Sequence, residues 1–306
     1  MLLVEEKGLS AAGRQHVAVM TEEVVRLVRA CKPMTIVDAT VGTGGHAEVL
    51  LEATGAHLLG LDRDAAAISH AGARLERFAD RVTLRQADFC NVDTVLDECG
   101  MPWAGAILAD LGMSSFALDD AARGFSFRLD GPLDMRMDQR QELRARDIVN
   151  EETEAELARI IAFYGEDRAA RRIAHALVEA RRRHPLETTG ELCAVIEGVV
   201  GGRRRGGINP ATRTFQALRI AVNREMESLA AFLEKAPARL AIGGRMIVIA
   251  YHSLEDRPVK HHFRELVHGG DFEAVTRKAS RPALEEVALN PRARSARLRC
   301  IERRSA

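Results

Sequence analysis

The sequence predicts an α/β fold, in which a mostly parallel sheet is covered by helices on both faces and carries an inserted helical domain. Two observations lead to this prediction. Short apolar segments alternate with helical patterns over residues 34–109, as they do in parallel sheets built from strand–helix–strand units. A further apolar segment, residues 245–250, follows only after a long stretch of helical patterns, and a connection of that length indicates an insertion.

The strands of the predicted sheet are short, apolar and bounded by polar or glycine-rich residues. They are expected at residues 34–39, 57–61, 82–86, 105–109 and 245–250. Residues 20–30 precede the first strand and carry apolar side chains on one face, which predicts a short helix. Helical patterns lie between the first three strands, so these strands are predicted to run parallel to one another.

The inserted helical domain is predicted to span residues 118–207, which leaves 1–117 and 208–306 as a discontinuous sheet domain. Within the insertion, Thr188 and Glu191 have the spacing of a capping box before an apolar helical pattern.

Three further patterns lie in or beside the insertion. Residues 168–183 are arginine-rich and amphipathic, and residues 201–207, GGRRRGG, predict a flexible basic hinge. Asn209 and Pro210 suit the start of a helix. The apolar spacing after them predicts one long helix through Leu229 that returns to the sheet.

Composition excludes several classes of protein. The 306 residues include 44 basic and 44 acidic side chains, so no global field favours nucleic acid or a membrane. The five cysteines are odd in number and form no CxxC pair, so neither a disulfide framework nor a metal site is expected. The N-terminal residues place acids where a signal peptide needs an apolar core, and no apolar run approaches the roughly 20 residues of a membrane span. We expect a cytoplasmic protein without a membrane partner.

Residues 36–46, IVDATVGTGGH, lead from a predicted strand through a glycine-rich turn into a helix. Gly42 and Gly44 permit a tight turn with the backbone close to a ligand, and Gly45 leaves the helix start uncrowded. Asp62 ends the second strand about twenty residues later, where a carboxylate can accept hydrogen bonds from both hydroxyls of a ribose. The pattern predicts a cofactor that contains a nucleoside. The glycine spacing also fits a dinucleotide fingerprint, so NAD remains an alternative.

The ends of three strands favour S-adenosylmethionine (SAM) over NAD. Asp38 lies in the first strand, where it can support the turn or approach an amino-acid group. The third strand ends in Ala87-Asp88-Phe89, which offers polar and apolar groups to an adenine. The fourth ends at Asp110, on the carboxyl edge where ligands collect in such sheets. We therefore predict the Rossmann-like fold of class I SAM-dependent methyltransferases.

Longer motifs are spread along the chain: HVAVMTEEV from His16, VGTGGH from Val41, DLGMSS from Asp110, RGFSFRLDGPLDMRMD from Arg123, NPATRTFQALRIAVN from Asn209, YHSLEDRPVK from Tyr251 and NPRARSARLR from Asn290. Together they resemble, nearly from end to end, the bacterial family of 16S rRNA cytosine N4-methyltransferases called RsmH or MraW. GPLDMRMD and ATRTFQALR are long and unusual, which makes the resemblance specific.

The resemblance implies methyl transfer from SAM to the exocyclic N4 of cytosine 1402 in 16S rRNA of the small ribosomal subunit. It places the SAM contacts on Gly44, Gly45, His46, Asp62, Phe89 and Asp110. No catalytic residue follows from it, and Asp110 is our candidate for a group that influences the target amine. Where the family has Gln seven residues after this acid, the chain has Ala117.

Contacts to RNA are predicted in the insertion, at Asp134 and Arg136 of GPLDMRMD and at Arg181, Arg182 and Arg183. A structural ion pair for the first two residues and a solvated helix face for the arginines are the alternatives. A Pro-Cys pair of the kind used for cytosine C5 methylation is absent, which favours nitrogen as the acceptor. Two other classes remain open, namely an NAD-dependent oxidoreductase and a non-catalytic RNA-binding protein.

Overall fold

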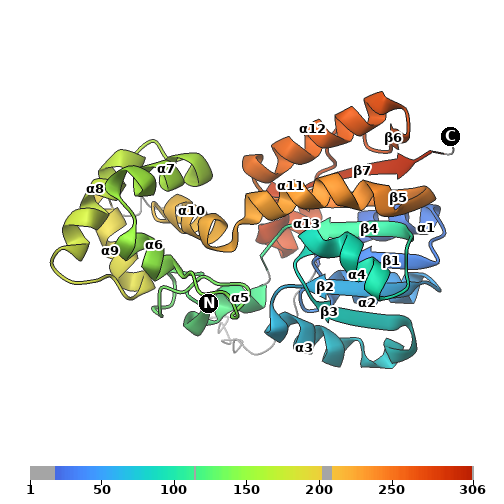
Figure 1. Ribbon diagram of the computed structural model, residues 1–306, viewed down its shortest axis with the longest axis horizontal. Helices are drawn as coiled ribbons and strands as arrows, with labels where there is room; N and C mark the ends of the chain where they lie inside the picture. The colour runs from blue at the N-terminus through green and yellow to red at the C-terminus, as the bar shows by residue number, and fades with distance from the viewer. Residues whose placement is uncertain (1–17, 114, 202–208, 305–306) are drawn as a thin grey trace, which may run out of the picture.

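The computed structural model describes residues 18–113, 115–201 and 209–304, and it has two parts (Figure 1). The sheet part holds every strand, and its helices are α1 (Thr21–Ala30), α2 (Gly45–Ala53), α3 (Ala65–Arg74), α4 (Val92–Glu98), α11 (Glu225–Lys235), α12 (Ser253–Gly269) and α13 (Leu284–Leu289). The helical part consists of α6 (Ala145–Glu151), α7 (Glu154–Gly165), α8 (Ala170–Arg181), α9 (Thr189–Val200) and α10 (Thr212–Asn223). The short helix α5 (Ser115–Asp119) lies where the chain passes from one part to the other.

Within the described residues, one sheet of seven strands has the order β3-β2-β1-β4-β5-β7-β6. The strands are β1 (Thr35–Asp38), β2 (His57–Asp62), β3 (Val82–Gln86), β4 (Ala104–Asp110), β5 (Leu240–Ala250), β6 (Phe272–Ala274) and β7 (Arg297–Arg303). Neighbours among β1 to β5 pair in parallel, and β7 runs antiparallel to β5 and β6. The α/β fold and the five predicted strands are confirmed, whereas β6 and β7 were not predicted.

Both faces of the sheet are buried, because successive side chains on each strand enter different apolar clusters. In β1, Ile36 packs in the cluster that includes α1, α2 and α3, and Val37 packs in the cluster that includes α4, α11 and α12. Leu58 and Leu59 divide in the same way in β2. Burial on both faces explains why these strands read as continuous apolar runs rather than as alternating patterns.

The helical part has an apolar cluster of its own. Leu157, Ile173, Leu192 and Phe215 bring α7, α8, α9 and α10 together in it. The Thr188 capping box forms as predicted, because the Thr188 hydroxyl accepts from the N–H of Glu191 while the Glu191 carboxylate accepts from the N–H of Thr188. Of the basic hinge predicted at residues 201–207, residues 202–207 lie outside the described residues.

The prediction of one long helix through Leu229 is wrong. The chain forms α10 and α11 instead, separated at Arg224, whose φ of 48° is in the left-handed region. No glycine or proline marks this break in the sequence. The two helices separate because each packs against a different part of the structure. Phe215 of α10 lies in the cluster of the helical part and Phe232 of α11 lies on the sheet. The domain limits stay a prediction, and this packing favours a helical unit that extends to Asn223.

Candidate cofactor and active site

The candidate site lies at the carboxyl edge of the sheet, where β1, β2 and β4 end at Asp38, Asp62 and Asp110. Between β1 and α2 the chain makes the glycine-rich turn. Gly44 has φ +85°, which L side chains rarely adopt, and a Cβ on it would lie 3.4 Å from the Leu75 side chain. The turn therefore places backbone groups close to the strand ends, without a Cβ at Gly44 that would crowd Leu75.

Asp62 joins this turn to the end of β2. Its carboxylate accepts hydrogen bonds from the backbone N–H of Gly42 at 3.0 Å and of Asp64 at 2.9 Å. Burial raises the pKa of Asp62 to about 6, so the carboxylate is still largely ionised at neutral pH. Each oxygen holds one backbone donor and keeps a lone pair that a ribose hydroxyl can use.

Asp38 and His46 are buried polar residues beside the turn. Asp38 accepts one hydrogen bond, from the N–H of Thr40 at 3.3 Å. Its other oxygen and both ring nitrogens of His46 have no hydrogen-bond partner among the described residues. The nearest acid to His46 is Asp110, whose Oδ2 lies 3.4 Å from Nε2, an ion-pair distance rather than a hydrogen bond. Because buried unpaired polar atoms are costly, the site suits a polar ligand that supplies the missing partners.

The charges of this cluster act on one another. Burial raises the pKa of Asp38 to about 7, because the ionised form loses its hydration. For His46, burial favours the neutral ring, but the nearby carboxylates of Asp110 and Asp38 outweigh it and the pKa is raised. Asp38 and His46 therefore each bind a proton more tightly in the ligand-free site than they would in water.

Replacing Asp38 by Asn is expected to stabilise the ligand-free protein, and more so at pH 8 than at pH 5. Folding raises the pKa of Asp38, so ionising this residue lowers the free energy of unfolding. This loss of stability is absent well below pH 4, grows as pH rises and is complete above pH 7. The gain at pH 8 should be on the order of 2 kcal/mol, a few degrees in Tm. Thermal unfolding at both pH values measures it, with Asp97→Asn on the exposed face of α4 as control. Equal gains at both pH values would refute the argument.

Asp110 ends β4 and is held from several sides. Its backbone N–H donates to the Thr40 hydroxyl at 2.7 Å, and its Oδ1 accepts from the Tyr251 hydroxyl at 2.8 Å. Neither Thr40 nor Tyr251 was predicted as a site residue. A signal for Tyr251 exists, since it directly follows β5, the strand beside β4, and so belongs to the same carboxyl edge.

Phe89 follows β3 and turns toward the core. Its ring meets Phe232 edge-on with 5.2 Å between centroids, and the Arg63 guanidinium lies 5.7 Å from its centroid. Asp88 beside it accepts from the N–H of Cys90 at 3.0 Å and pairs with Arg63 at 2.8 Å. The contact of Phe89 with SAM stays a prediction, and this packing favours a contact through its backbone or ring edge.

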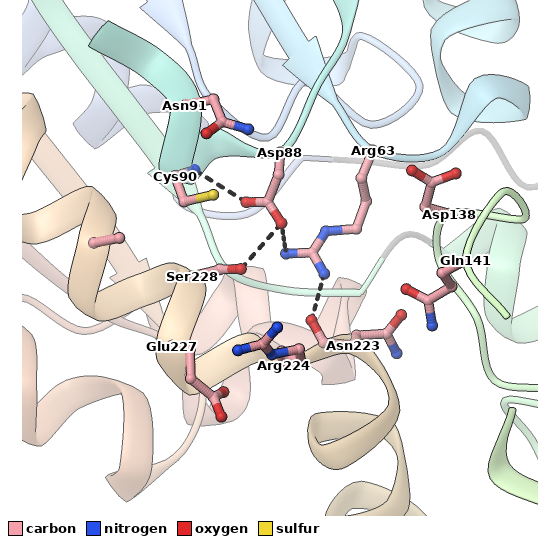
Figure 2. A pocket seen from close by; sticks show the side chains of 11 residues that line it. Arg63, Asp88, Cys90, Asn91, Asp138, Gln141, Asn223, Arg224, Glu227 and Ser228 are labelled. Atoms are coloured by element: carbon pink, nitrogen blue, oxygen red, sulfur yellow. Dashed lines mark hydrogen bonds and ion pairs between the residues drawn. The ribbon is translucent and has the colours of Figure 1, made fainter. Parts of the chain in front are cut away.

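A polar pocket of about 420 Å³ opens where the two parts meet (Figure 2). Arg63 and Asp88 line it from the sheet part, Asp138 from the loop before α6, and Asn223 and Arg224 from the junction of α10 and α11. Arg63 of the sheet part reaches the helical part, because its guanidinium donates to the backbone carbonyl of Asn223 at 2.7 Å. The pocket thus connects the carboxyl edge with the helical part.

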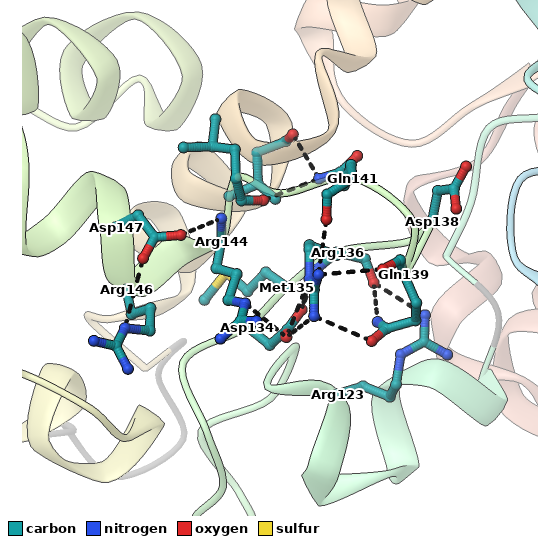
Figure 3. A network of polar contacts seen from close by, with 12 residues as sticks. Arg123, Asp134, Met135, Arg136, Asp138, Gln139, Gln141, Arg144, Arg146 and Asp147 are labelled. Atoms are coloured by element: carbon teal, nitrogen blue, oxygen red, sulfur yellow. Dashed lines mark hydrogen bonds and ion pairs between the residues drawn. The ribbon is translucent and has the colours of Figure 1, made fainter.

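Asp134 and Arg136 pair with each other in the loop before α6 (Figure 3). The guanidinium lies 2.8 Å from the Asp134 carboxylate and also donates to the carbonyls of Gln139 and Gln141 at 3.2 and 2.7 Å. Arg123 ties the same loop to the sheet part, through the carbonyl of Arg136 at 3.0 Å and the Asp64 carboxylate at 2.7 Å. Contacts of Asp134 and Arg136 with RNA stay a prediction, and the structure gives both residues partners within the loop.

The three consecutive arginines at the end of α8 differ in their surroundings. Arg181 donates to the carbonyls of Val149 and Glu152 at 2.7 and 2.6 Å, which satisfies the end of α6. Arg182 pairs with Glu179 on its own helix, and its side chain is 68% exposed. Arg183 is exposed as well. As RNA contacts all three remain predictions, and only Arg182 and Arg183 lie open to solvent.

Three further points concern Ala117, metal-binding groups and membrane-spanning helices. Ala117, where a Gln was expected from the resemblance, is buried in the apolar cluster of the helical part. The described residues include no group of three or more His, Cys, Asp or Glu side chains suited to a metal ion. They also include no helix that is both long and apolar enough to cross a membrane.

Comparison with known proteins decides the family. A model of the MraW methylase family matches residues 13–304. The chain belongs to the MraW methylase family. Relatives named ribosomal RNA small subunit methyltransferase H include one from Cutibacterium acnes, 48% identical over 87% of this chain and 84% of its own length. Another, from Sorangium cellulosum, is 45% identical over 95% of this chain and 91% of its own length. A third, from Syntrophotalea carbinolica, is 46% identical over 94% of this chain and 98% of its own length.

Among solved structures, an rRNA methylase from Streptococcus thermophilus aligns with 95% of this chain and 100% of its own, at a TM-score of 0.45 and 12% identity. The class I assignment follows from the sheet of the MraW methylase itself. Five parallel strands and the antiparallel β7 inserted between β5 and β6 build the Rossmann-like methyltransferase architecture.

Proposed function

We propose that this MraW methylase transfers a methyl group from SAM to the exocyclic N4 of cytosine 1402 in 16S rRNA, within the small ribosomal subunit in the cytoplasm. The observation that carries the proposal is the buried cluster of Asp38, His46 and Asp110 beside the glycine turn, in a chain of this family. The names of its relatives, which refer to the RNA of the small subunit, support the choice of substrate.

The residues at the carboxyl edge suit the groups of SAM. Asp62 would hold the ribose hydroxyls with its free lone pairs. The backbone at Gly44 and Gly45, with the unpaired atoms of His46 and Asp38, would hold the amino-acid end. The end of β3 at Asp88 and Phe89 would border the adenine. The orphaned polar atoms of the cluster support this fit, because the amino-acid end of SAM carries an ammonium and a carboxylate group that can pair with them.

Bound SAM supplies a methyl group on a positively charged sulfonium, which is a good leaving group. The protein's contribution is alignment and electrostatics. The lone pair of cytosine N4 is delocalised into the ring, so N4 is a poor nucleophile until an acceptor draws on its N–H. Oδ2 of Asp110 can accept this hydrogen bond and stabilise the positive charge that develops on the nitrogen. Holding the three reacting atoms in line can supply several kcal/mol more.

The target base must leave any stack to reach Asp110, which is least costly in a loop or single strand. The pocket at the junction of the two parts, together with the exposed Arg182 and Arg183 just after α8, would hold the flanking RNA. Arginine side chains contact the phosphates of RNA, and such contacts weaken as salt rises. The contribution of Arg182 and Arg183 to RNA affinity should therefore depend on the salt concentration.

Replacing Arg182 and Arg183 together by Gln should weaken RNA binding and lower the slope of log K against log salt by roughly 2. SAM affinity should not change. Arg181 is left intact because its donors satisfy backbone carbonyls. The matched control is Arg26 and Arg29 on α1, since Arg26 is 67% exposed and pairs with Glu23 three residues away, as Arg182 does with Glu179. An unchanged slope would show that the α8 arginines are solvated helix surface.

Methyl transfer itself is tested by incubating purified protein with labelled SAM and small subunits that lack the modification. Label in 16S rRNA is the expected result, and no label would exclude the proposal in favour of a non-catalytic RNA-binding protein. Calorimetry with SAM and with NAD separates the oxidoreductase alternative. Binding of NAD without binding of SAM would contradict the assignment of the cofactor.

A further inference from the structure

Tyr251 stands beside Asp110 at the end of the neighbouring strand. Asp110 is in register with Ile249 of β5, and Tyr251 is the first residue after that strand. The chain thus places the two residues on adjacent strand ends at the carboxyl edge. Their side chains meet there, because the Tyr251 hydroxyl donates to Oδ1 of Asp110 at 2.8 Å.

The Tyr251 ring has little freedom to move. Its backbone N–H donates at 2.7 Å to the carboxylate of Glu255, a residue that is only 3% exposed. The ring lies against the backbone of Gly112, where an added Cβ would be 2.7 Å from Cε2 of the ring and 3.2 Å from the hydroxyl oxygen. Only glycine at position 112 leaves room for this arrangement. The hydroxyl is therefore held at Asp110 by packing as well as by its hydrogen bond.

The two oxygens of Asp110 have different roles in this arrangement. Oδ1 accepts from the Tyr251 hydroxyl at 2.8 Å and from the backbone N–H of Gly112 at 3.4 Å, whereas Oδ2 lies 3.4 Å from Nε2 of His46. Burial and the nearby charge of Asp110 raise the pKa of Tyr251, so the hydroxyl keeps its proton in the working range of pH. The Asp110 N–H is fixed separately, by the Thr40 hydroxyl. The carboxylate cannot rotate freely, and one oxygen is left for an incoming donor.

We propose that Tyr251 is a positioning residue for methyl transfer, whose hydroxyl holds Oδ1 of Asp110 so that Oδ2 faces the exocyclic amine of the target base. The inference rests on the proposed function. In the transfer, the N4–carbon bond forms as the carbon–sulfur bond breaks, and the electron pair of the broken bond stays on sulfur. The extra proton of the amine passes to Oδ2 of Asp110 and from there to solvent.

Tyr251→Phe keeps the ring and removes only the hydrogen bond to Asp110. We expect kcat at saturating SAM and RNA to fall by roughly 10-fold, with the Kd for SAM changed by less than about 3-fold. Gly112→Ala should lower kcat in the same way, because its Cβ displaces the ring although both hydrogen-bonding groups remain. If Tyr251 had only a structural role, its substitution would lower the stability of the protein but would not lower kcat while leaving SAM binding nearly unchanged.

A second readout needs no RNA. The chain has two tyrosines, so in a Tyr164→Phe background fluorotyrosine is incorporated only at position 251. Tyr164 lies on α7, in the helical part. Asp110→Asn should shift the fluorine resonance of this protein, whereas Asp97→Asn on α4 should not. If the Tyr251→Phe variant did not fold, as shown by the absence of a cooperative unfolding transition, the fluorine resonance and the kinetics of Gly112→Ala would test the role of Tyr251 instead.

The outcomes separate the inference from the function on which it rests. A wild-type protein that does not methylate small-subunit RNA would overturn both. An active wild type together with a folded Tyr251→Phe variant of undiminished kcat would overturn the role of Tyr251 alone. A fluorine resonance unmoved by Asp110→Asn would also overturn it, because it would show that the hydroxyl does not sense the carboxylate.

Discussion

Replacing Asp110 by Asn is expected to lower methyl transfer by roughly 10²-fold or more, even when SAM is saturating. The amide keeps the shape of the side chain and can still accept from Tyr251 through its oxygen. It places a neutral NH₂ group where Oδ2 stood, so it neither accepts from the target amine nor stabilises its developing charge. The change therefore removes an interaction made mainly in the transition state.

Single-turnover rates measured with protein saturated with SAM are the appropriate test of this variant. Asp97→Asn, on an exposed part of α4, is the control for a general loss of negative charge. Near-normal single-turnover rates combined with weaker SAM binding would leave Asp110 as a cofactor ligand and remove it from the chemical step.

Replacing Asp62 by Ala is expected to weaken SAM binding by about 2–3 kcal/mol, or roughly 30- to 150-fold in Kd. In the proposed function, this side chain binds the ribose hydroxyls. Its carboxylate also accepts from the N–H groups of Gly42 and Asp64, so the Ala variant should lose stability, on the order of 1 kcal/mol, as well as affinity.

Asp62→Asn is an intermediate case, because its amide oxygen can still accept from one of the two N–H groups of the turn, whereas the charge that strengthens the bonds to the ribose is lost. Calorimetry with SAM, together with thermal unfolding of the ligand-free variants, measures both affinity and stability. SAM affinity that is unchanged in a folded Asp62→Ala protein would remove Asp62 from the site.

Much of the fold could be predicted because burial on both faces leaves a simple pattern. The strands that end at Asp38, Asp62 and Asp110 are continuous apolar runs, and parallel strands bring their carboxyl ends to one edge. The glycine turn could be predicted for a similar reason, since the left-handed φ of Gly44 excludes most other residues.

The missed features depend on contacts between segments far apart in sequence. β7 is a half-buried strand with arginines at alternate positions, and β6 has three residues, so neither has a strong local pattern. The break at Arg224 has no local signal, because α10 and α11 are separated by what they pack against. Arg181 belongs to a basic cluster in the sequence, but whether its donors face phosphates or the carbonyls of Val149 and Glu152 depends on the fold.

The most direct test of the account is nucleoside mass spectrometry of 16S rRNA from cells with and without this protein. The account predicts N4-methylation of a single cytidine in 16S rRNA when the protein is present, and its loss when the gene is deleted. Restoring the wild-type gene should restore the mark, and restoring the Asp110→Asn variant should not. An N4-methylcytidine content that is identical with and without the gene would contradict the account.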